Sequence, residues 1–194
     1  MIPRAPFAGL PVKPTEGSGV IVRDRDGLGL ATVLVKTAMN QALAHRVREC
    51  FRIELPHGPR RATAGDIALI GTGPGAWLAT HEHAGNALAA SLKETIGDLA
   101  CVSDQSDGYA VLGLSGPKVR DTLMKLVPID VHPRAFKIGD VAATVAARIG
   151  ATLWRLEDGA DGSPVFEIAV FRSLATSFWI ALTQSAAEFG LVSS

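Results

Sequence analysis

Apolar and small residues fill both sets of alternating positions between Tyr109 and Leu114, and this pattern predicts a strand that is covered on both faces. The strand is followed by Ser115-Gly-Pro117, which predicts a tight turn with Ser115 as the cap of a short helix. In that helix the apolar positions 119, 123 and 126 recur at helical spacing, and Pro128 ends the run. A strand, a turn and an amphipathic helix therefore open the C-terminal half of the chain.

The remainder of the C-terminal half predicts three more strands and a helix. Residues 139–157 alternate between apolar and polar or small side chains, with a break at Gly150 that separates two strands. Residues 165–171 predict the third of these strands. Ser173 is placed to cap the following helix, which ends near Gly190.

In the N-terminal half, residues 19–25 and 28–35 read as strands around Asp26-Gly27, a dipeptide that predicts a β-hairpin. Helices are predicted over about residues 38–50 and 81–97, with strands that begin at Asp66 and Trp77 and another through Cys101. This order of elements predicts an α+β fold with antiparallel sheets and split βαβ units. Four prolines within residues 1–18 predict an extended N-terminal arm. Residues 19–194 then form a single domain, or two subdomains of about 19–105 and 106–194.

Seven segments of the sequence carry a resemblance to one protein family. They are residues 26–34, 51–56, 71–79, 114–120, 130–136, 147–155 and 166–179. In their order and spacing they resemble the gamma subunit of heterotetrameric sarcosine oxidase, over about residues 19–191. That family is similar in turn to the folate-binding domain of the glycine-cleavage aminomethyltransferases, the T-proteins, so the resemblance implies the fold of that domain.

The resemblance also implies a function. The chain would be a non-catalytic subunit of a flavoenzyme that oxidatively demethylates sarcosine or a related N-methyl amino acid. It would dock on the alpha subunit, in one complex with beta and delta subunits, and support assembly. FAD, FMN, NAD and tetrahydrofolate would belong to the other subunits, and this chain would bind no cofactor.

Candidate residues for the contact with another subunit follow from the enrichment of Trp and Arg at interface hot spots. They lie on the strand that contains Trp154 and in the connections before it: His132, Arg134, Arg148, Trp154 and Arg155. A place in the core is the alternative for Trp154 and Arg155. Trp179 is predicted to be a core residue, because it adjoins the apolar face of its helix.

Composition limits the classes of function. With 47% hydrophobic and 20% charged residues the chain can bury a core, and 19 basic against 19 acidic residues argue against a nucleic-acid binder. The sequence contains no run of about 20 apolar residues such as a membrane span needs, so we expect a cytoplasmic protein. Cys50 and Cys101 are too few for a disulfide scaffold, and we expect both in the core.

One alternative function is a stand-alone folate-binding protein of one-carbon transfer. Aminomethyltransferases would have an Asp-Asp-Leu-type segment where this chain has residues 106–110. Asp107 is present there, without a second carboxylate, beside the turn residue Gly108. No nucleophile and base are recognisable from their spacing either, so the sequence predicts no catalytic residues.

A second alternative is a nucleotide- or phosphate-binding module on the glycine-rich residues 71–75. Their spacing is not that of a dinucleotide fingerprint, and Pro74 removes one N–H group that a phosphate would use, so the pattern favours a bent connection between strands. His81 and His83 are the only closely spaced pair of metal-ligand type and would need ligands from elsewhere. The sequence therefore predicts no metal site.

Overall fold

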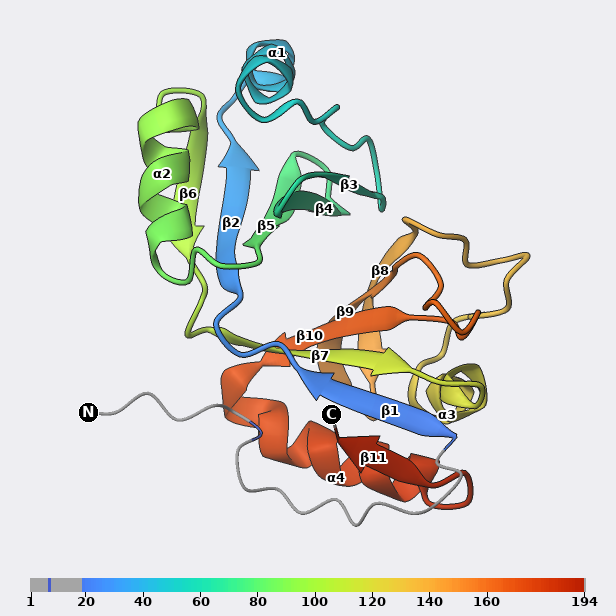
Figure 1. Cartoon of the computed structure of the whole chain (residues 1–194). Helices are drawn as coiled ribbons and strands as arrows, with labels where there is room; N and C mark the ends of the chain where they lie inside the picture. Colours follow the sequence, from blue (N-terminus) through green and yellow to red (C-terminus); the bar gives the residue numbers. More distant parts are fainter. Residues whose placement is uncertain (1–6, 8–18, 194) are drawn as a thin grey trace. The chain divides into compact units, whose positions relative to one another are not determined.

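The computed structural model describes Phe7 and residues 19–193, and it confirms the predicted α+β class with antiparallel sheets (Figure 1). Apart from Phe7, the predicted N-terminal arm lies outside the described residues. The chain forms two compact units, which we call the central unit, Gly27–Tyr109, and the discontinuous unit, Met1–Asp26 with Ala110–Ser194. The single-domain and two-subdomain interpretations of residues 19–194 both stay predictions. None of the helices in the described part of the chain is long and apolar enough to cross a membrane.

The central unit contains a five-stranded sheet in the order β3-β4-β5-β2-β6, in which all neighbours are antiparallel. Since β5 and β6 both pair with β2 and are joined by α2, this sheet contains a split βαβ unit. The elements are β2 (Gly29–Val35), α1 (Asn40–Phe51), β3 (Arg61–Ala64), β4 (Ile67–Gly73), β5 (Ala76–His81), α2 (Ala87–Ile96) and β6 (Ala100–Asp104).

The core of the central unit lies between one face of this sheet and the two helices α1 and α2 (Figure 1). Alternate residues of the strands face the helices, which is the period of a sheet with one helix-covered face. The buried set includes Val33, Leu43, Val47, Trp77, Leu92 and Val102. The same alternation explains why the expectation for Cys101 is wrong: it is exposed, since its neighbours Ala100 and Val102 take the buried positions. Cys50, on the last turn of α1, is also exposed.

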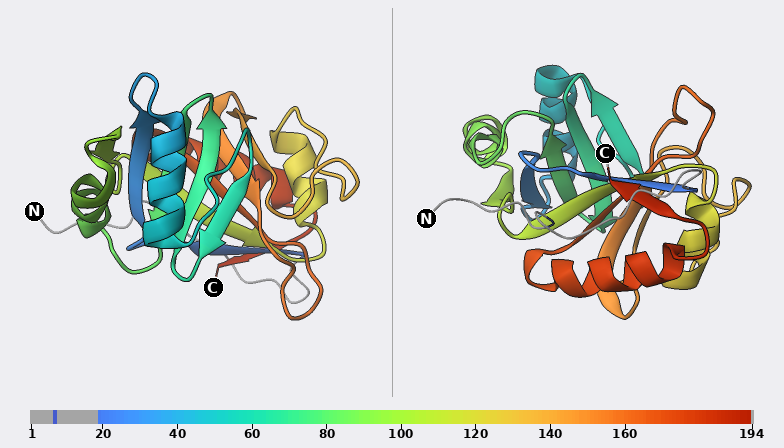
Figure 2. Two further views of the ribbon diagram at one scale, coloured as in Figure 1. Left: turned by 90° about the horizontal axis from the view of Figure 1, so that it is seen from above. Right: turned by 60° about the horizontal axis from the view of Figure 1, so that its bottom comes forward.

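The discontinuous unit contains a six-stranded sheet in the order β11-β1-β7-β10-β9-β8, with α3 and α4 packed on one face (Figures 1 and 2). Its core is formed by alternate strand residues and by the apolar faces of α3 and α4. Trp179 belongs to this core, as predicted, and its ring centroid lies 5.8 Å from that of Phe7. The elements are β1 (Val20–Asp24), β7 (Tyr109–Ser115), α3 (Val119–Leu126), β8 (Val141–Ala146), β9 (Ile149–Arg155), β10 (Phe166–Phe171), the 3-10 turn η1 (Arg172–Leu174), α4 (Ala175–Ala186) and β11 (Leu191–Ser193).

The hairpin predicted at Asp26-Gly27 is wrong. Both strands exist, but β1 pairs with β7 and β11, whereas β2 pairs with β5 and β6 in the other sheet. Gly27 has the positive φ of +82° that makes the dipeptide a turn signal. The signal is local, however, and it does not specify whether the two strands that it separates belong to one sheet.

Two predicted helix caps are also wrong. Ser115 is the last residue of β7, and α3 begins only at Val119, after Lys118. The turn between them depends on Gly116, which has a φ of +103° and would bring a Cβ to 2.5 Å from the Gly19 carbonyl oxygen. Ser173 lies in η1, and α4 begins at Ala175 without a side-chain cap.

The hairpin of β8 and β9 turns at Ala147-Arg148, two residues before the break predicted at Gly150. These residues have φ values of 49° and 70°, the sign that a two-residue type I′ turn requires. Gly or Asn usually occupies such positions, because a Cβ is crowded at positive φ. This chain therefore places two residues with side chains where glycine is the relaxed choice.

Replacement of Arg148 by glycine should relieve that strain. We expect Arg148→Gly to raise the free energy of unfolding of the isolated chain by about 1 kcal/mol, measured by urea denaturation. Ala143→Gly, in the extended part of the same hairpin, is the matched control and should lower it by about 0.5–1 kcal/mol. A loss of stability in both variants would contradict the strained turn.

Candidate subunit interface

The five residues predicted for a subunit contact all lie in the discontinuous unit, in two different environments. His132 and Arg134 lie in the segment between α3 and β8, and Arg148 lies in the β8–β9 turn; all three are exposed. Trp154 and Arg155 are consecutive on β9 and are 0% and 2% exposed. The predicted contact surface therefore rests on the three exposed residues, and the interface assignment of the five stays a prediction.

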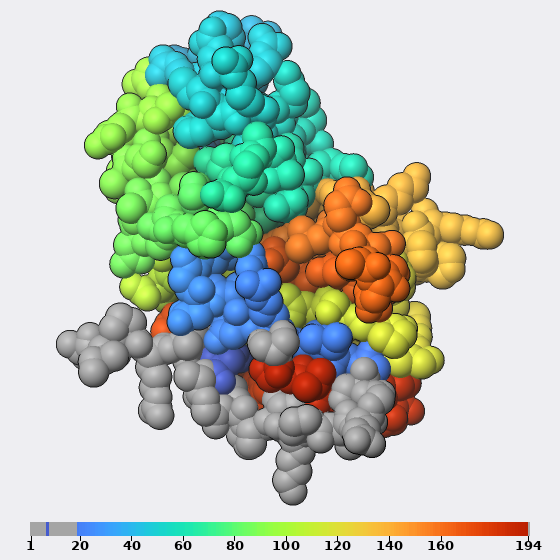
Figure 3. Space-filling model, viewed as in Figure 1, coloured from blue at the N-terminus to red at the C-terminus, as the bar shows by residue number. Residues whose placement is uncertain are grey.

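The segment that carries His132 and Arg134 is held by its own hydrogen bonds. The Asp130 carboxylate accepts from the His132 N–H at 2.8 Å, and the His132 carbonyl accepts from the N–H groups of Ala135 and Phe136 at 2.9 and 2.8 Å. The buried Phe136 ring stacks on Phe166, with centroids 6.3 Å apart. These contacts fix the backbone and leave the His132 and Arg134 side chains at the surface, where Figure 3 shows the segment in gold.

Trp154 belongs to a buried polar cluster on the face of the sheet opposite α3 and α4. Its indole N–H donates to Glu167 Oε2 at 2.8 Å, across the β9–β10 pair. The other oxygen of Glu167 accepts from Arg25 Nε at 2.5 Å, and the two charged side chains are 8% and 13% exposed. The carboxylate thus has a partner at each oxygen, as a buried charge requires.

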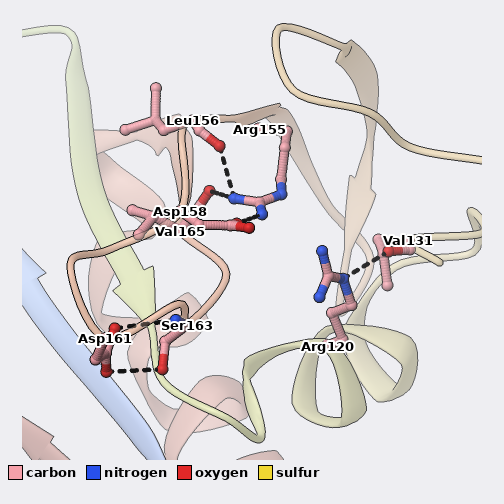
Figure 4. Close-up of polar contacts among 8 residues, drawn as sticks. All are labelled: Arg120, Val131, Arg155, Leu156, Asp158, Asp161, Ser163 and Val165. Carbon is pink, nitrogen blue, oxygen red and sulfur yellow. Dashed lines mark hydrogen bonds and ion pairs between the residues drawn. The ribbon is translucent and has the colours of Figure 1, made fainter. Parts of the chain in front are cut away.

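Arg155 points to the opposite face, toward the core that contains α3 and α4. Its guanidinium donates to the carbonyls of Leu156 and Val165, both at 2.6 Å, and forms an ion pair with Asp158 (Figure 4). It also lies over the Phe166 ring, 4.9 Å from the centroid. Burial lowers the pKa of this guanidinium and the charge of Arg120 lowers it further, while Glu157 raises it. These contacts close the loop between β9 and β10.

Arg120 is a second arginine in this environment that the sequence reasoning missed. It is the second residue of α3, and its Nε donates to the Val131 carbonyl at 3.2 Å (Figure 4). Its guanidinium carbon lies 5.7 Å from the Phe166 centroid. Burial lowers the pKa of its guanidinium. The sequence did contain a signal, because a cation at a helix N-terminus opposes the helix dipole.

The glycine-rich residues 71–75 form the bent connection between β4 and β5, as the sequence favoured. The Gly71 N–H donates to the Arg60 carbonyl at 2.9 Å, and a bulge interrupts the register between Gly71 and Gly73. A Cβ at Gly71 would lie 2.0 Å from the Gly58 carbonyl oxygen. The close approach of these two backbones explains the glycine.

Two of the cavities that described residues line lie within the central unit. One of about 290 Å³ is lined by residues that include His45, Arg48 and His57, and one of about 350 Å³ by residues that include Asp66 and His81. His81 Nδ1 accepts from the His83 N–H at 3.3 Å. Among the described residues no group of three or more His, Cys, Asp or Glu side chains could hold a metal ion.

Residues 106–108 form a tight turn. They belong to the stretch where aminomethyltransferases would have the Asp-Asp-Leu-type segment. The Asp104 carboxylate accepts from the N–H and the hydroxyl of Ser106 at 3.0 and 2.8 Å, and Ser106 Oγ accepts from the Leu30 N–H at 3.1 Å. These bonds tie the end of β6 to the start of β2. They account for Asp104 and Ser106 by a structural contact, whereas Asp107 is exposed.

Comparison with known proteins adds to this geometry. Residues 36–188 match the model of the sarcosine oxidase, gamma subunit family. The chain belongs to this family. A gamma subunit of sarcosine oxidase from Arthrobacter sp is 37% identical over 99 residues, which are 50% of this chain and 48% of that protein. The chain therefore spans about half the length of this curated relative.

Solved structures show that this chain shares its fold with a chain of heterotetrameric sarcosine oxidase and with an aminomethyltransferase. A structure of heterotetrameric sarcosine oxidase from Corynebacterium sp. U-96, in complex with pyrrole 2-carboxylate, contains a chain with a TM-score of 0.82 and 24% identity, matched over 97% of both chains. The glycine cleavage system aminomethyltransferase T from Bartonella henselae gives a TM-score of 0.65 at 14% identity, over 91% of this chain and 48% of that one. The predicted similarity in fold is thus confirmed.

The buried cluster of Glu167 should contribute strongly to stability. Because Glu167→Ala leaves the charge of Arg25 without this carboxylate in a buried site, we expect a loss of about 3 kcal/mol in the free energy of unfolding. The control is Glu188→Ala, which removes an exposed carboxylate paired with Lys125 and should cost about 0.5 kcal/mol or less. Urea denaturation of both variants measures this difference, and equal losses would contradict the structural role of Glu167.

Proposed function

We propose that the chain is the gamma subunit of a heterotetrameric, sarcosine-oxidase-type flavoenzyme and that it contributes to assembly rather than to catalysis. The observation that carries this proposal is the family match over residues 36–188. The likeness in fold to a chain of heterotetrameric sarcosine oxidase, over 97% of both chains, supports it.

In this proposal the chain docks on the alpha subunit, in a complex that also contains beta and delta subunits. FAD, FMN, NAD and tetrahydrofolate are carried by the other subunits, which oxidatively demethylate sarcosine or a related N-methyl amino acid. A cytoplasmic location belongs to the same proposal.

The contacts of the polar residues support a role without catalysis. Glu167 and Trp154 bind each other in the interior, and Arg155 holds a loop through two carbonyls and Asp158. Side chains engaged in this way stabilise the fold and are not directed at a substrate. Among the exposed side chains nearby, His132, Arg134 and Arg148 are basic and Asp130 and Glu157 are acidic; arginine is the residue of this set that is enriched at protein contacts.

The docking surface that we favour lies around β8. This strand is at the edge of its sheet and, among the described strands, pairs only with β9. Ile138, in the segment before β8, and Val145, on β8, are 42% and 45% exposed. Arg134 precedes the strand and Arg148 follows it. An apolar, uncharged edge strand is normally covered, and a partner subunit would cover this one.

A second candidate function is folate binding by the isolated chain, which the fold shared with an aminomethyltransferase favours. Titration of the purified chain with tetrahydrofolate, followed by fluorescence of its tryptophans, tests this candidate. Saturable binding would favour a one-carbon transfer function. Absence of binding by the isolated chain, together with assembly into a complex, is the outcome that our proposal expects.

Purification of the tagged chain from its own host tests the assembly directly. We expect the chain to bring down one large and two smaller partners with flavin absorbance, one copy each by native mass spectrometry, and to be colourless when produced alone. A stable, partner-free monomer in the host extract would overturn the proposal.

Charge reversal on the proposed surface should weaken assembly without loss of fold. We expect Arg134→Glu with Arg148→Glu to raise the dissociation constant of the complex at least tenfold, because rim charges guide and stabilise docking. Arg52→Glu with Lys93→Glu, two exposed positions on the central unit, is the matched control and should have little effect. If both double variants assemble equally well, the docking surface lies elsewhere.

A further inference from the structure

We infer that Arg120 is a carboxylate-binding residue and that the carboxylate belongs to an acidic side chain of a partner subunit. The inference rests on the proposed function, because it identifies one contact of that assembly. It starts from a comparison of the two arginines that lie over the ring of Phe166.

Arg155 has the partners that a buried guanidinium requires, and Arg120 does not. Two carbonyls and the Asp158 carboxylate accept from Arg155. Arg120 makes one bond, from Nε to the Val131 carbonyl at 3.2 Å. No acceptor within the described part of the chain lies within hydrogen-bonding distance of its two terminal nitrogens, and no carboxylate there forms an ion pair with it. The side of the guanidinium that can bind a carboxylate with two parallel bonds is therefore free.

The position of Arg120 is unfavourable for an uncompensated cation in three ways. The side chain is half-buried, so it has lost part of its hydration, and this lowers the pKa of its guanidinium. The guanidinium of Arg155 is a like charge nearby, and the charge of Arg120 lowers the pKa of Arg155. The residue also lies in the first turn of α3, where the helix dipole favours a negative charge. One bound carboxylate would offset all three.

The surroundings favour a side chain delivered by another protein over a free small molecule. The two cavities described above are lined by residues of the central unit, so neither contains Arg120. The carbonyl that Arg120 contacts belongs to Val131, directly before the exposed His132, and Arg134 follows in the same turn. Arg120 thus adjoins the surface proposed for docking, where it and the exposed Arg134 would meet an acidic partner, while the neighbouring Asp130 carboxylate accepts from the His132 N–H.

The test is Arg120→Gln, which keeps a polar side chain but removes the charge and the paired donors. We expect the dissociation constant of the complex to rise at least tenfold, while the urea midpoint of the isolated chain stays unchanged or rises. Arg120→Lys should also weaken the complex, because an ammonium cannot bind a carboxylate through a planar pair of donors. Arg23→Gln, at an exposed position on β1, is the control and should change neither quantity.

Three other results would overturn the inference. If Arg120→Gln lowers the urea midpoint of the isolated chain and assembles like the Arg23→Gln variant, Arg120 acts only as a structural contact of α3. If acetate raises the melting temperature of the isolated chain, but not of Arg120→Gln, while assembly is unaffected, the ligand is a free carboxylate. If the unmodified chain forms no complex at all, the proposed function fails, and with it the assignment to a partner; the acetate titration then still decides whether Arg120 binds carboxylates.

Discussion

The ring of Phe166 is the contact that joins α3, the segment before β8 and the end of β9 in the discontinuous unit. The side chain is fully buried on β10, and three segments distant in sequence converge on it. Phe136 stacks on it from the segment between α3 and β8, and the guanidinium groups of Arg120 and Arg155 lie over it from α3 and β9. The planar face of one aromatic side chain can thus receive both apolar and cationic neighbours.

This arrangement explains why charged residues occur so close to a core. Arg155 is almost completely buried, but its hydrogen bonds are made to carbonyls of the loop that it closes. Glu167, on the opposite face of the sheet, has an indole and a guanidinium as partners. In both cases a buried charge is paired and also fixes the position of a chain segment, which an apolar residue of similar size would not do.

The exposed positions of the same unit have a different character. Arg148 lies in a turn with positive φ, and β8 is an edge strand without a charged residue. Neither feature stabilises the chain by itself. Glycine would adopt the positive φ of the turn with less strain, and a charged residue on β8 would protect this edge strand from pairing with another chain. The assembly that we propose would offer a reason, because a subunit keeps surface features for its partner rather than for its own stability.

The sequence was sufficient for the class of fold, for most elements and for the family, because these depend on local periodicity and on the order of segments. Periodicity in β7, α3 and α4 reports which side chains are buried, and it does so independently of the distant parts of the chain. The tertiary structure was needed wherever the outcome depends on distant partners. It placed β1 and β2 in different sheets, although Asp26-Gly27 is a hairpin signal.

The tertiary structure also separated the five candidate interface residues into buried and exposed ones, and it revealed the environment of Arg120, which its place near a helix N-terminus only hinted at. Burial and hydrogen bonding of Trp154, Arg155 and Arg120 depend on contacts with Glu167, Val165 and Val131, and residue type alone does not specify such contacts. A tryptophan or an arginine suits a core as well as an interface. The difference between the two environments arises only when the strands and loops are packed together.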